Sequence, residues 1–363
     1  MNSTCKILFS FVFSVFLSQT AQAQQALPSR LVWKVNKVDL GTLLEEEGPQ
    51  IAEFSFTHTQ DSLFFIEKVW TDCGCTTADF TRDTLKVGES GTVKVSFDPS
   101  SGAGFFSRMI VVKGNLAGSQ DTLFIEGIAI PYPENPEKAY GVRKADLGFR
   151  LSKVNMGEAF TNEPKLKEIE FYNFSKSTLK KSELNSQTPE YITISQVQDS
   201  IRPQERGLLL ISYDGKSKND LGFFEDRTVL FWAEKQKFEL DIMADVFEYF
   251  APFSKENLNT IPQLFMENKE VNLGGISPNS IQTRTVSLEN KGQEVLEIRK
   301  IQGNCECLKL EISKTIINPG EILELKITFD PKGRLGIDQR NIYIFSNDPV
   351  NSVQLVVLKS RVE

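Results

Sequence analysis

The chain has 363 residues, of which 40% are hydrophobic and 25% are charged, a composition typical of two or three folded domains and not of a disordered segment. Its net charge of −7 and its pI near 5.2 argue against nucleic acid or an anionic membrane surface as the main partner.

The first residues have the order of a secretory signal peptide. Lys6 is the only charge before an apolar run from Ile7 to Leu17, and the small residues Ala21 and Ala23 follow it. We therefore predict cleavage after Ala23, although an uncleaved anchor is the alternative. The run is too short for a comfortable transmembrane helix, so we expect a mature chain without a transmembrane segment.

One stretch of the sequence occurs three times at a constant spacing. Residues 85–99 (LKVGESGTVKVSFDP) return as residues 317–331 (INPGEILELKITFDP), and a weaker copy lies at residues 201–214 (IRPQERGLLLISYD). The aspartate near the end of each copy recurs every 116 residues, at Asp98, Asp214 and Asp330. In each copy a turn containing Gly or Pro precedes alternating apolar and polar residues. This alternation predicts a half-buried β-strand, which Asp-Pro should end.

Other features align with this repeat and predict the fold. A Val-Asp/Asn-Leu/Met-Gly motif precedes each copy, at residues 38–41, 154–157 and 271–274. In the first and third copies, the strand that leads to a Cys-X-Cys motif has one step that breaks its alternation of apolar and polar residues. This break predicts a bulge or a turn. Each of the three repeats, taken with the sequence around its copy, holds about six or seven short strands in roughly 100 residues. We therefore predict an all-β chain of three tandem immunoglobulin-like β-sandwich domains, since several features at nearly constant offset argue against chance.

The predicted organisation follows from the repeat. It consists of a signal peptide at 1–23, a leader at 24–30, a first immunoglobulin-like domain with Cys-X-Cys at 31–131, a linker at 132–142, a second domain without cysteines at 143–248, a linker at 249–265, and a third domain with Cys-X-Cys at 266–363. The prolines of the first linker predict a stiff, extended segment. The second linker contains several phenylalanines and is expected to pack on a domain.

The first and third copies share the motifs Asp/Asn-Cys-X-Cys, Gly-Glu and Phe-Asp-Pro, found at residues 72–75, 88–89 and 97–99, and again at 304–307, 320–321 and 329–331. With these motifs the two copies resemble a bacterial protein family of unknown function, DUF1573. The resemblance covers 31–131 and 266–363, whereas the second copy has Pro189 and Tyr191 at the cysteine positions. The family is similar to the immunoglobulin-like domains of the Hydin and major sperm protein group. It implies an exported sandwich, often of Gram-negative envelopes, and provides no activity from which to assign functional residues.

Removal of the signal peptide would leave four cysteines, in the pairs Cys73/Cys75 and Cys305/Cys307. In an extended strand, residues i and i+2 lie about 6.6 Å apart, at the edge of the Cα distance that a disulfide allows. A bridge within each pair is therefore possible if the chain tightens, and Gly74 should permit this more easily than Glu306. Pairing between the motifs is not expected, because the short loop should close first.

Three interpretations of these cysteines stay open. They can be structural residues, either bridged or buried as small apolar side chains. They can be reactive redox thiols. They can also bind Cu(I), although two thiolates alone make an incomplete site for most metals.

The sequence offers little for catalysis. His58 is the only histidine, and it aligns with Asn173 and Asn290 at a turn between strands. Because His and Asn both tolerate a left-handed backbone, we predict a turn residue here and not a ligand or catalyst. A Ser-His-Asp or Cys-His site has no other imidazole available, and the carboxylates show no spacing typical of an acid–base pair.

The favoured hypothesis is a non-enzymatic structural or protein-binding protein with no cofactor and no metal site. It would be exported to the periplasm or cell surface of a Gram-negative bacterium, and its partner would be another envelope or secreted protein, bound through sheet edges and loops. The alternative is a thiol redox or Cu(I)-binding protein that uses Cys73, Cys75, Cys305 and Cys307. A carboxylate-based hydrolase is a weaker third hypothesis.

Overall fold

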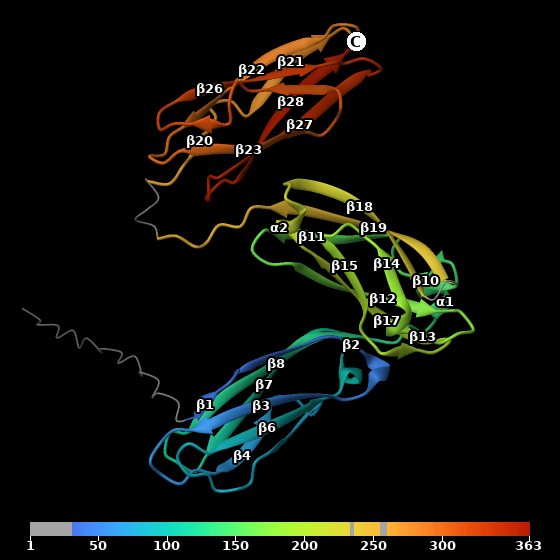
Figure 1. Cartoon of the computed structure of the whole chain (residues 1–363), viewed down its shortest axis with the longest axis vertical. Helices are drawn as coiled ribbons and strands as arrows, with labels where there is room; N and C mark the ends of the chain where they lie inside the picture. Colours follow the sequence, from blue (N-terminus) through green and yellow to red (C-terminus); the bar gives the residue numbers. More distant parts are fainter. Residues whose placement is uncertain (1–30, 233–235, 255–259) are drawn as a thin grey trace, which may run out of the picture. The chain divides into compact units, whose positions relative to one another are not determined.

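The computed structural model describes residues 31–232, 236–254 and 260–363 (Figure 1). The predicted signal peptide and leader lie outside these residues, as does the segment 255–259 of the second predicted linker. No helix in the described ranges combines the length and the hydrophobicity needed to cross a bilayer.

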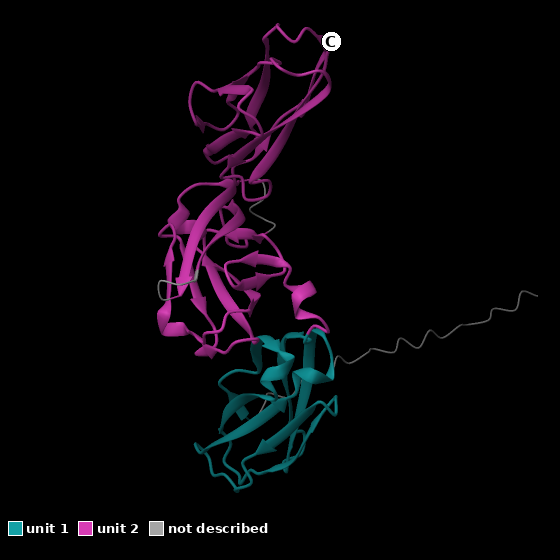
Figure 2. Ribbon diagram, turned by 90° about the vertical axis from the view of Figure 1, so that its right-hand side faces the viewer, with its two compact units in different colours: residues 1–132 teal, residues 133–363 magenta. Residues whose placement is uncertain are grey.

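The chain divides into two compact units at Tyr132 (Figure 2). The first unit is a sandwich of two sheets, with the strand orders β1-β3-β6-β5 and β2-β8-β7-β4. Its elements are β1 Leu31–Trp33, β2 Lys37–Leu44, the 3-10 helix η1 Glu45–Glu47, β3 Gln50–His58, β4 Ile66–Thr71, β5 Thr76–Phe80, β6 Ser90–Phe97, η2 Pro99–Ser101, β7 Gly104–Gly114 and β8 Gln120–Ile130.

The second unit contains two more sandwiches. The second sandwich has the strand orders β15-β17-β12-β10-β9 and β11-β19-β18-β14, with a small β13-β16 pair. Its elements are α1 Pro136–Ala139, β9 Val142–Lys144, β10 Leu147–Phe149, β11 Lys153–Phe160, β12 Lys165–Asn173, β13 Leu179–Lys180, η3 Lys181–Glu183, β14 Leu184–Gln187, β15 Ile192–Gln196, β16 Ser200–Ile201, β17 Arg206–Tyr213, α2 Gly215–Lys218, β18 Gly222–Trp232 and β19 Gln236–Phe247.

The third sandwich has the strand orders β20-β22-β26-β24 and β21-β28-β27-β23-β25. Its elements are β20 Leu264–Phe265, β21 Glu270–Ile276, β22 Gln282–Asn290, β23 Leu296–Gly303, β24 Leu308–Glu311, β25 Ile316–Ile317, β26 Ile322–Phe329, β27 Gly336–Ser346 and β28 Val353–Val362.

The order of strands confirms the predicted all-β, two-sheet architecture. In the first sandwich, β1, β3, β6 and β5 correspond to strands A, B, E and D of an immunoglobulin-like sandwich, while β4, β7 and β8 correspond to C, F and G. Each of the three sandwiches encloses its own cluster of buried apolar side chains. The second and third sandwiches share one compact unit, so three separate domains remain a prediction.

The repeated strand is confirmed in all three copies as β6, β17 and β26, whose bounds differ by the repeat length. The residues predicted to face inward are at most 1% exposed: Val93, Val95, Phe97, Leu209, Ile211, Tyr213, Leu325, Ile327 and Phe329. The aspartate after each strand accepts a hydrogen bond from the backbone N–H two residues later, so it turns the chain as the strand ends.

The Val-Asp/Asn-Leu/Met-Gly motif forms a bulge in the strand that pairs in parallel with the last strand of each sandwich. The register shifts within or beside this motif in β2, β11 and β21. In each copy the Asp or Asn side chain accepts a hydrogen bond from the N–H of the glycine two residues later, at 2.8–2.9 Å. The motif therefore encodes a change of register.

The turn before the repeated strand has the same geometry in all three sandwiches. Its third residue has a positive φ: Gly88 (83°), Gln204 (63°) and Gly320 (74°). The following glutamate accepts a hydrogen bond from the N–H three residues earlier, at 2.7–2.9 Å. Gln204 thus adopts a conformation that favours glycine, because its Cβ lies too close to the neighbouring carbonyl oxygen.

Gln204→Gly is therefore expected to stabilise the second sandwich by about 0.5–1 kcal/mol. The reciprocal change, Gly88→Gln, should destabilise the first sandwich by a similar amount, because no atom lies within 4 Å of a Cβ placed there and only backbone strain is added. Urea unfolding of both variants measures the difference. A lower stability for Gln204→Gly would show that the positive φ is not the deciding factor.

The first linker is not extended throughout, contrary to our expectation. Within the predicted range 132–142, Pro136–Ala139 forms α1, and Tyr140 is fully buried. The Tyr140 hydroxyl donates a hydrogen bond to Glu170 at 2.6 Å. A buried aromatic ring with a satisfied hydroxyl fixes this part of the chain on the second sandwich. In the second predicted linker, Leu264 is buried and belongs to β20, so the third sandwich begins before residue 266.

Candidate functional site

Each Cys-X-Cys motif forms a turn that connects the two sheets of its sandwich. In the first sandwich the turn joins β4, at the edge of one sheet, to β5, at the edge of the other. In the third sandwich the corresponding turn joins β23 to β24. The strand before each turn contains the predicted irregularity, a register shift between Ile66 and Lys68 and between Ile298 and Lys300.

Backbone hydrogen bonds attach each turn to both sheets. In the first sandwich the Asp98 N–H donates to the Cys75 carbonyl at 3.1 Å, and Asp72 pairs with Met109 of β7 through its N–H and its carboxylate. In the third sandwich Asp330 donates to Cys307 at 2.9 Å, and Asn304 pairs with Asn341 in the same way. These bonds explain why Asp/Asn-Cys-X-Cys and Phe-Asp-Pro occur together in the sequence.

The structure joins Cys73 to Cys75 and Cys305 to Cys307 by disulfides, with 5.2 Å between the Cα atoms in both. All four cysteines are half-buried, and Cys75 and Cys307 pack against the cores of their sandwiches. The residue between the cysteines points to solvent in both turns. The Cα separation is the same with Gly74 or Glu306 between the cysteines, and no atom lies within 4 Å of a Cβ placed at Gly74.

The second sandwich makes the same turn without cysteines. Pro189 and Tyr191 occupy the cysteine positions. The Ile192 N–H donates to the Pro189 carbonyl at 2.9 Å, and the Asp214 N–H donates to the Tyr191 carbonyl at 2.8 Å. These bonds correspond to those that Cys73 and Cys75 accept. The backbone of the turn therefore forms without a covalent bond.

The motifs that build these turns coincide with a family model described as "Protein of unknown function (DUF1573)", which matches residues 31–129 and 264–362. The chain belongs to the DUF1573 family. The second sandwich, which lacks the cysteines, lies between the two matches. No curated protein matches the sequence significantly.

The solved structures that match include one bacterial protein and two animal domains. A protein of unknown function from Porphyromonas gingivalis W83 is 12% identical, and the match covers 60% of this chain and 100% of that one with a TM-score of 0.42. The ASH / PapD-like domain 7 of human CEP192 is 15% identical over 32% of this chain and 93% of that one, with a TM-score of 0.25. WR4, a C. elegans MSP family member, is 14% identical over 28% and 97%, with a TM-score of 0.20.

In the second sandwich a polar cluster surrounds Tyr191, which occupies the position of the second cysteine of the DUF1573 repeats. The Tyr191 and Tyr213 hydroxyls donate to the two carboxylate oxygens of Asp226, at 2.6 and 2.9 Å. Lys218 donates to the Tyr191 hydroxyl at 2.7 Å and lies 3.3 Å from Asp226. This cluster connects β18 in one sheet with β17 in the other, as the turn does. No pattern in the sequence indicates it.

The environment of the cluster keeps both tyrosines protonated. Burial, and then the hydrogen bond to Asp226, raise the pKa of Tyr213 above its usual range. The same two causes raise the pKa of Tyr191. Burial opposes the charge of Lys218, but its interactions with Tyr191 and Asp226 outweigh that effect and raise its pKa. The two tyrosines and Lys218 therefore keep their protons near neutral pH, and the cluster is a stabilising network.

His58, Asn173 and Asn290 are fully buried at the ends of β3, β12 and β22, and none of them has a positive φ. The prediction of a left-handed turn residue is therefore wrong. Each side chain instead hydrogen-bonds the carbonyl four residues later, that of Ser62 at 2.6 Å, Ser177 at 2.9 Å and Glu294 at 2.8 Å. The shared property of His and Asn here is a side-chain N–H that satisfies a loop carbonyl.

His58→Ala is expected to lower the stability of the first sandwich by about 2–3 kcal/mol, because it removes this hydrogen bond and the contact with Phe64, whose ring centroid lies 5.3 Å away. His58→Asn should recover at least about 1 kcal/mol of that loss, since an amide can reach the same carbonyl. Thermal and urea melts provide the comparison. Equal losses in the two variants would exclude a hydrogen-bonding role.

Proposed function

We propose that this DUF1573 protein is an exported, non-enzymatic component of a Gram-negative cell envelope, built of three separately folded sandwiches and used to bind another envelope or secreted protein. The observation that carries the proposal is an exposed apolar sheet face in the first unit. The face lies beside the Cys73–Cys75 turn.

The face consists of outward side chains of β4, β7 and β8. Phe105 is opposite Ile128, and Met109 is opposite Phe124. Their exposed fractions are 71%, 47%, 38% and 37%, and Trp70 of the adjacent edge strand is 37% exposed. The polar pair Ser107 and Glu126 lies between the two apolar pairs. Cross-strand apolar pairs on a solvent face add little to the core of the sandwich, and exposed apolar patches mark interaction surfaces.

In the third sandwich the corresponding sheet contacts the second sandwich of the same chain. Lys300 of β23 donates to the Leu221 carbonyl of the second sandwich at 2.7 Å and pairs with Asp220 at 2.8 Å. Tyr343 of β27 lines a cavity together with residues of the second sandwich. Strand β27 is the counterpart of β7, so the same kind of face serves as a docking surface within the second unit.

A photo-reactive benzoylphenylalanine introduced at Phe105 tests the proposal in native cells. We expect one discrete protein adduct, which weakens when Trp70→Ala and Met109→Ala are added. The control site is Leu166 of β12, which is similarly exposed (58%) but belongs to a different face. Equal adducts at the two sites, or none at Phe105, would contradict a binding role for this face.

A second candidate function is supported by the cysteine-free turn. Since the second sandwich forms the turn without a bridge, the disulfides are not needed for its shape, and their half-buried sulfur atoms suit thiol redox chemistry or Cu(I) binding. Titration of the reduced protein separates the candidates. A lowered thiol pKa with stoichiometric Cu(I) uptake would favour this function, and ordinary thiol pKa values without uptake would exclude it.

A further inference from the structure

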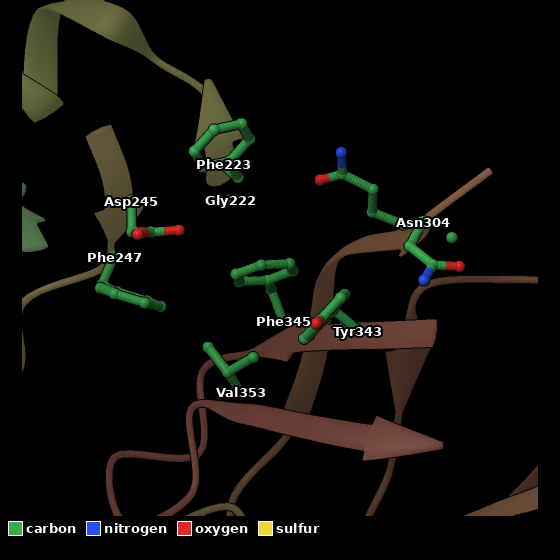
Figure 3. Close-up of a pocket in the computed structure, with 10 residues that line it drawn as sticks. Gly222, Phe223, Asp245, Phe247, Asn304, Tyr343, Phe345 and Val353 are labelled. Atoms are coloured by element: carbon green, nitrogen blue, oxygen red, sulfur yellow. The ribbon is translucent and has the colours of Figure 1, made fainter. Parts of the chain in front are cut away.

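A cavity of about 690 Å³ lies between the second and third sandwiches of the second unit (Figure 3). Four aromatic rings contribute to its wall: Phe223 and Phe247 from the second sandwich, and Tyr343 and Phe345 from the third. Asp245 of β19 is the carboxylate in this wall, and Figure 3 shows it directed toward the space between the rings. The volume is within the range of ligand sites and exceeds that of a single side chain.

Two ion pairs join the second sandwich to the third. Arg299 binds both carboxylate oxygens of Glu248, at 2.9 and 3.0 Å, and Lys300 pairs with Asp220 at 2.8 Å. Gly222 lies so close to the third sandwich that a Cβ there would be 2.6 Å from the side-chain oxygen of Gln302. The bidentate Arg299–Glu248 pair and the close approach at Gly222 hold the two walls against each other, so the cavity has a defined shape.

The carboxylates near the cavity differ in whether they have an ion-pair partner. Glu248 and Asp220 are neutralised by Arg299 and Lys300. The Asp245 carboxylate, in contrast, makes no hydrogen bond or ion pair with any residue that the structure describes. A free carboxylate among aromatic faces attracts a cation, because the faces of the rings also carry negative potential. The net charge of −7 adds a long-range attraction for basic partners.

We propose that this cavity binds an arginine or lysine side chain presented by an extended segment of a partner protein. The cationic head would pair with Asp245 and lie against the faces of Phe223 and Phe345, while the remaining volume accommodates the flanking backbone. The inference rests on the proposed protein-binding function and names the chemistry of one partner. It concerns the second unit, whereas the cross-linking test above concerns the first, so the failure of either can be told from the failure of the other.

The test uses the full chain and a fluorescein-labelled peptide with one central arginine flanked by serines. Fluorescence anisotropy should show binding that weakens at least about fivefold when arginine is replaced by its uncharged isostere citrulline, and that weakens with increasing salt. Asp245→Asn and Phe223→Ala should each weaken binding of the arginine peptide about fivefold or more.

Two matched variants serve as controls. Glu239→Gln removes a negative charge from the same strand, and Phe65→Ala removes an exposed ring from the first unit; both should leave binding unchanged. The proposal would be overturned if the arginine peptide did not bind, or if the citrulline peptide bound equally well. It would also be overturned if the Asp245→Asn variant bound the arginine peptide as tightly as the unaltered protein does. Displacement of the peptide by a neutral oligosaccharide would also overturn it and assign the cavity to a sugar.

Discussion

Phe329→Ala is expected to lower the free energy of unfolding of the third sandwich by about 3–5 kcal/mol. Phe329 ends the repeated strand β26 and is 1% exposed in the core of that sandwich. Its removal leaves a cavity that the neighbouring strands cannot close, because they are fixed by pairing on both sides, with β22 and β24. Urea unfolding followed by fluorescence or circular dichroism measures the loss.

Thr328→Ala is the matched control on the adjacent residue. Thr328 faces outward, and its hydroxyl lies 3.4 Å from that of Thr283 on the neighbouring strand. The substitution should cost well under about 1 kcal/mol, because a surface pair of this kind contributes little. Similar losses for the two variants would show that the assignment of inward and outward faces is wrong.

Asp226→Ala should destabilise the second sandwich by about 2–3 kcal/mol. Asp226 accepts hydrogen bonds from Tyr191 and Tyr213, and only 12% of its side chain is exposed. Its removal leaves the hydroxyl of the fully buried Tyr213 without an acceptor and the largely buried Lys218 without its carboxylate partner. Unsatisfied buried donors carry a penalty of this order.

Asp245→Ala is the control for this prediction, because its carboxylate has no hydrogen-bond or ion-pair partner among the described residues. It should change stability by less than about 0.5 kcal/mol. Tyr213→Phe should be intermediate, since the Asp226 carboxylate loses one donor but keeps Tyr191 and Lys218. If Asp226→Ala is no worse than Asp245→Ala, the cluster does not stabilise the second sandwich.

The sandwich strands could be predicted from the sequence because their signal is local. Alternation with a period of two marks the buried face of β6 and β26 directly, and the Asp that ends each strand is adjacent to it. The cluster around Asp226 could not be predicted in this way. Its tyrosines are 35 and 13 residues away along the chain, and only the pairing of strands in three dimensions brings them together.

The error at His58 has a different physical cause. The alignment of His58 with Asn173 and Asn290 correctly indicates a shared role, but that role does not depend on the backbone conformation. The shared property is instead a side-chain N–H donor for a buried carbonyl. The helical turn α1 and the burial of Tyr140 were missed because proline-rich composition reports stiffness and does not report packing against a neighbouring sheet.

Disulfide mapping of the protein purified from its native envelope, with free thiols alkylated before digestion, tests the central claim that each Cys-X-Cys turn closes on itself and connects the two sheets of its sandwich. Closure of a three-residue loop needs only about 1.6 kcal/mol of chain entropy, so the local bridge should form first. We predict unalkylated peptides with a Cys73–Cys75 and a Cys305–Cys307 bond. Alkylated cysteines, or a peptide pair that links Cys73 or Cys75 to Cys305 or Cys307, would contradict the account.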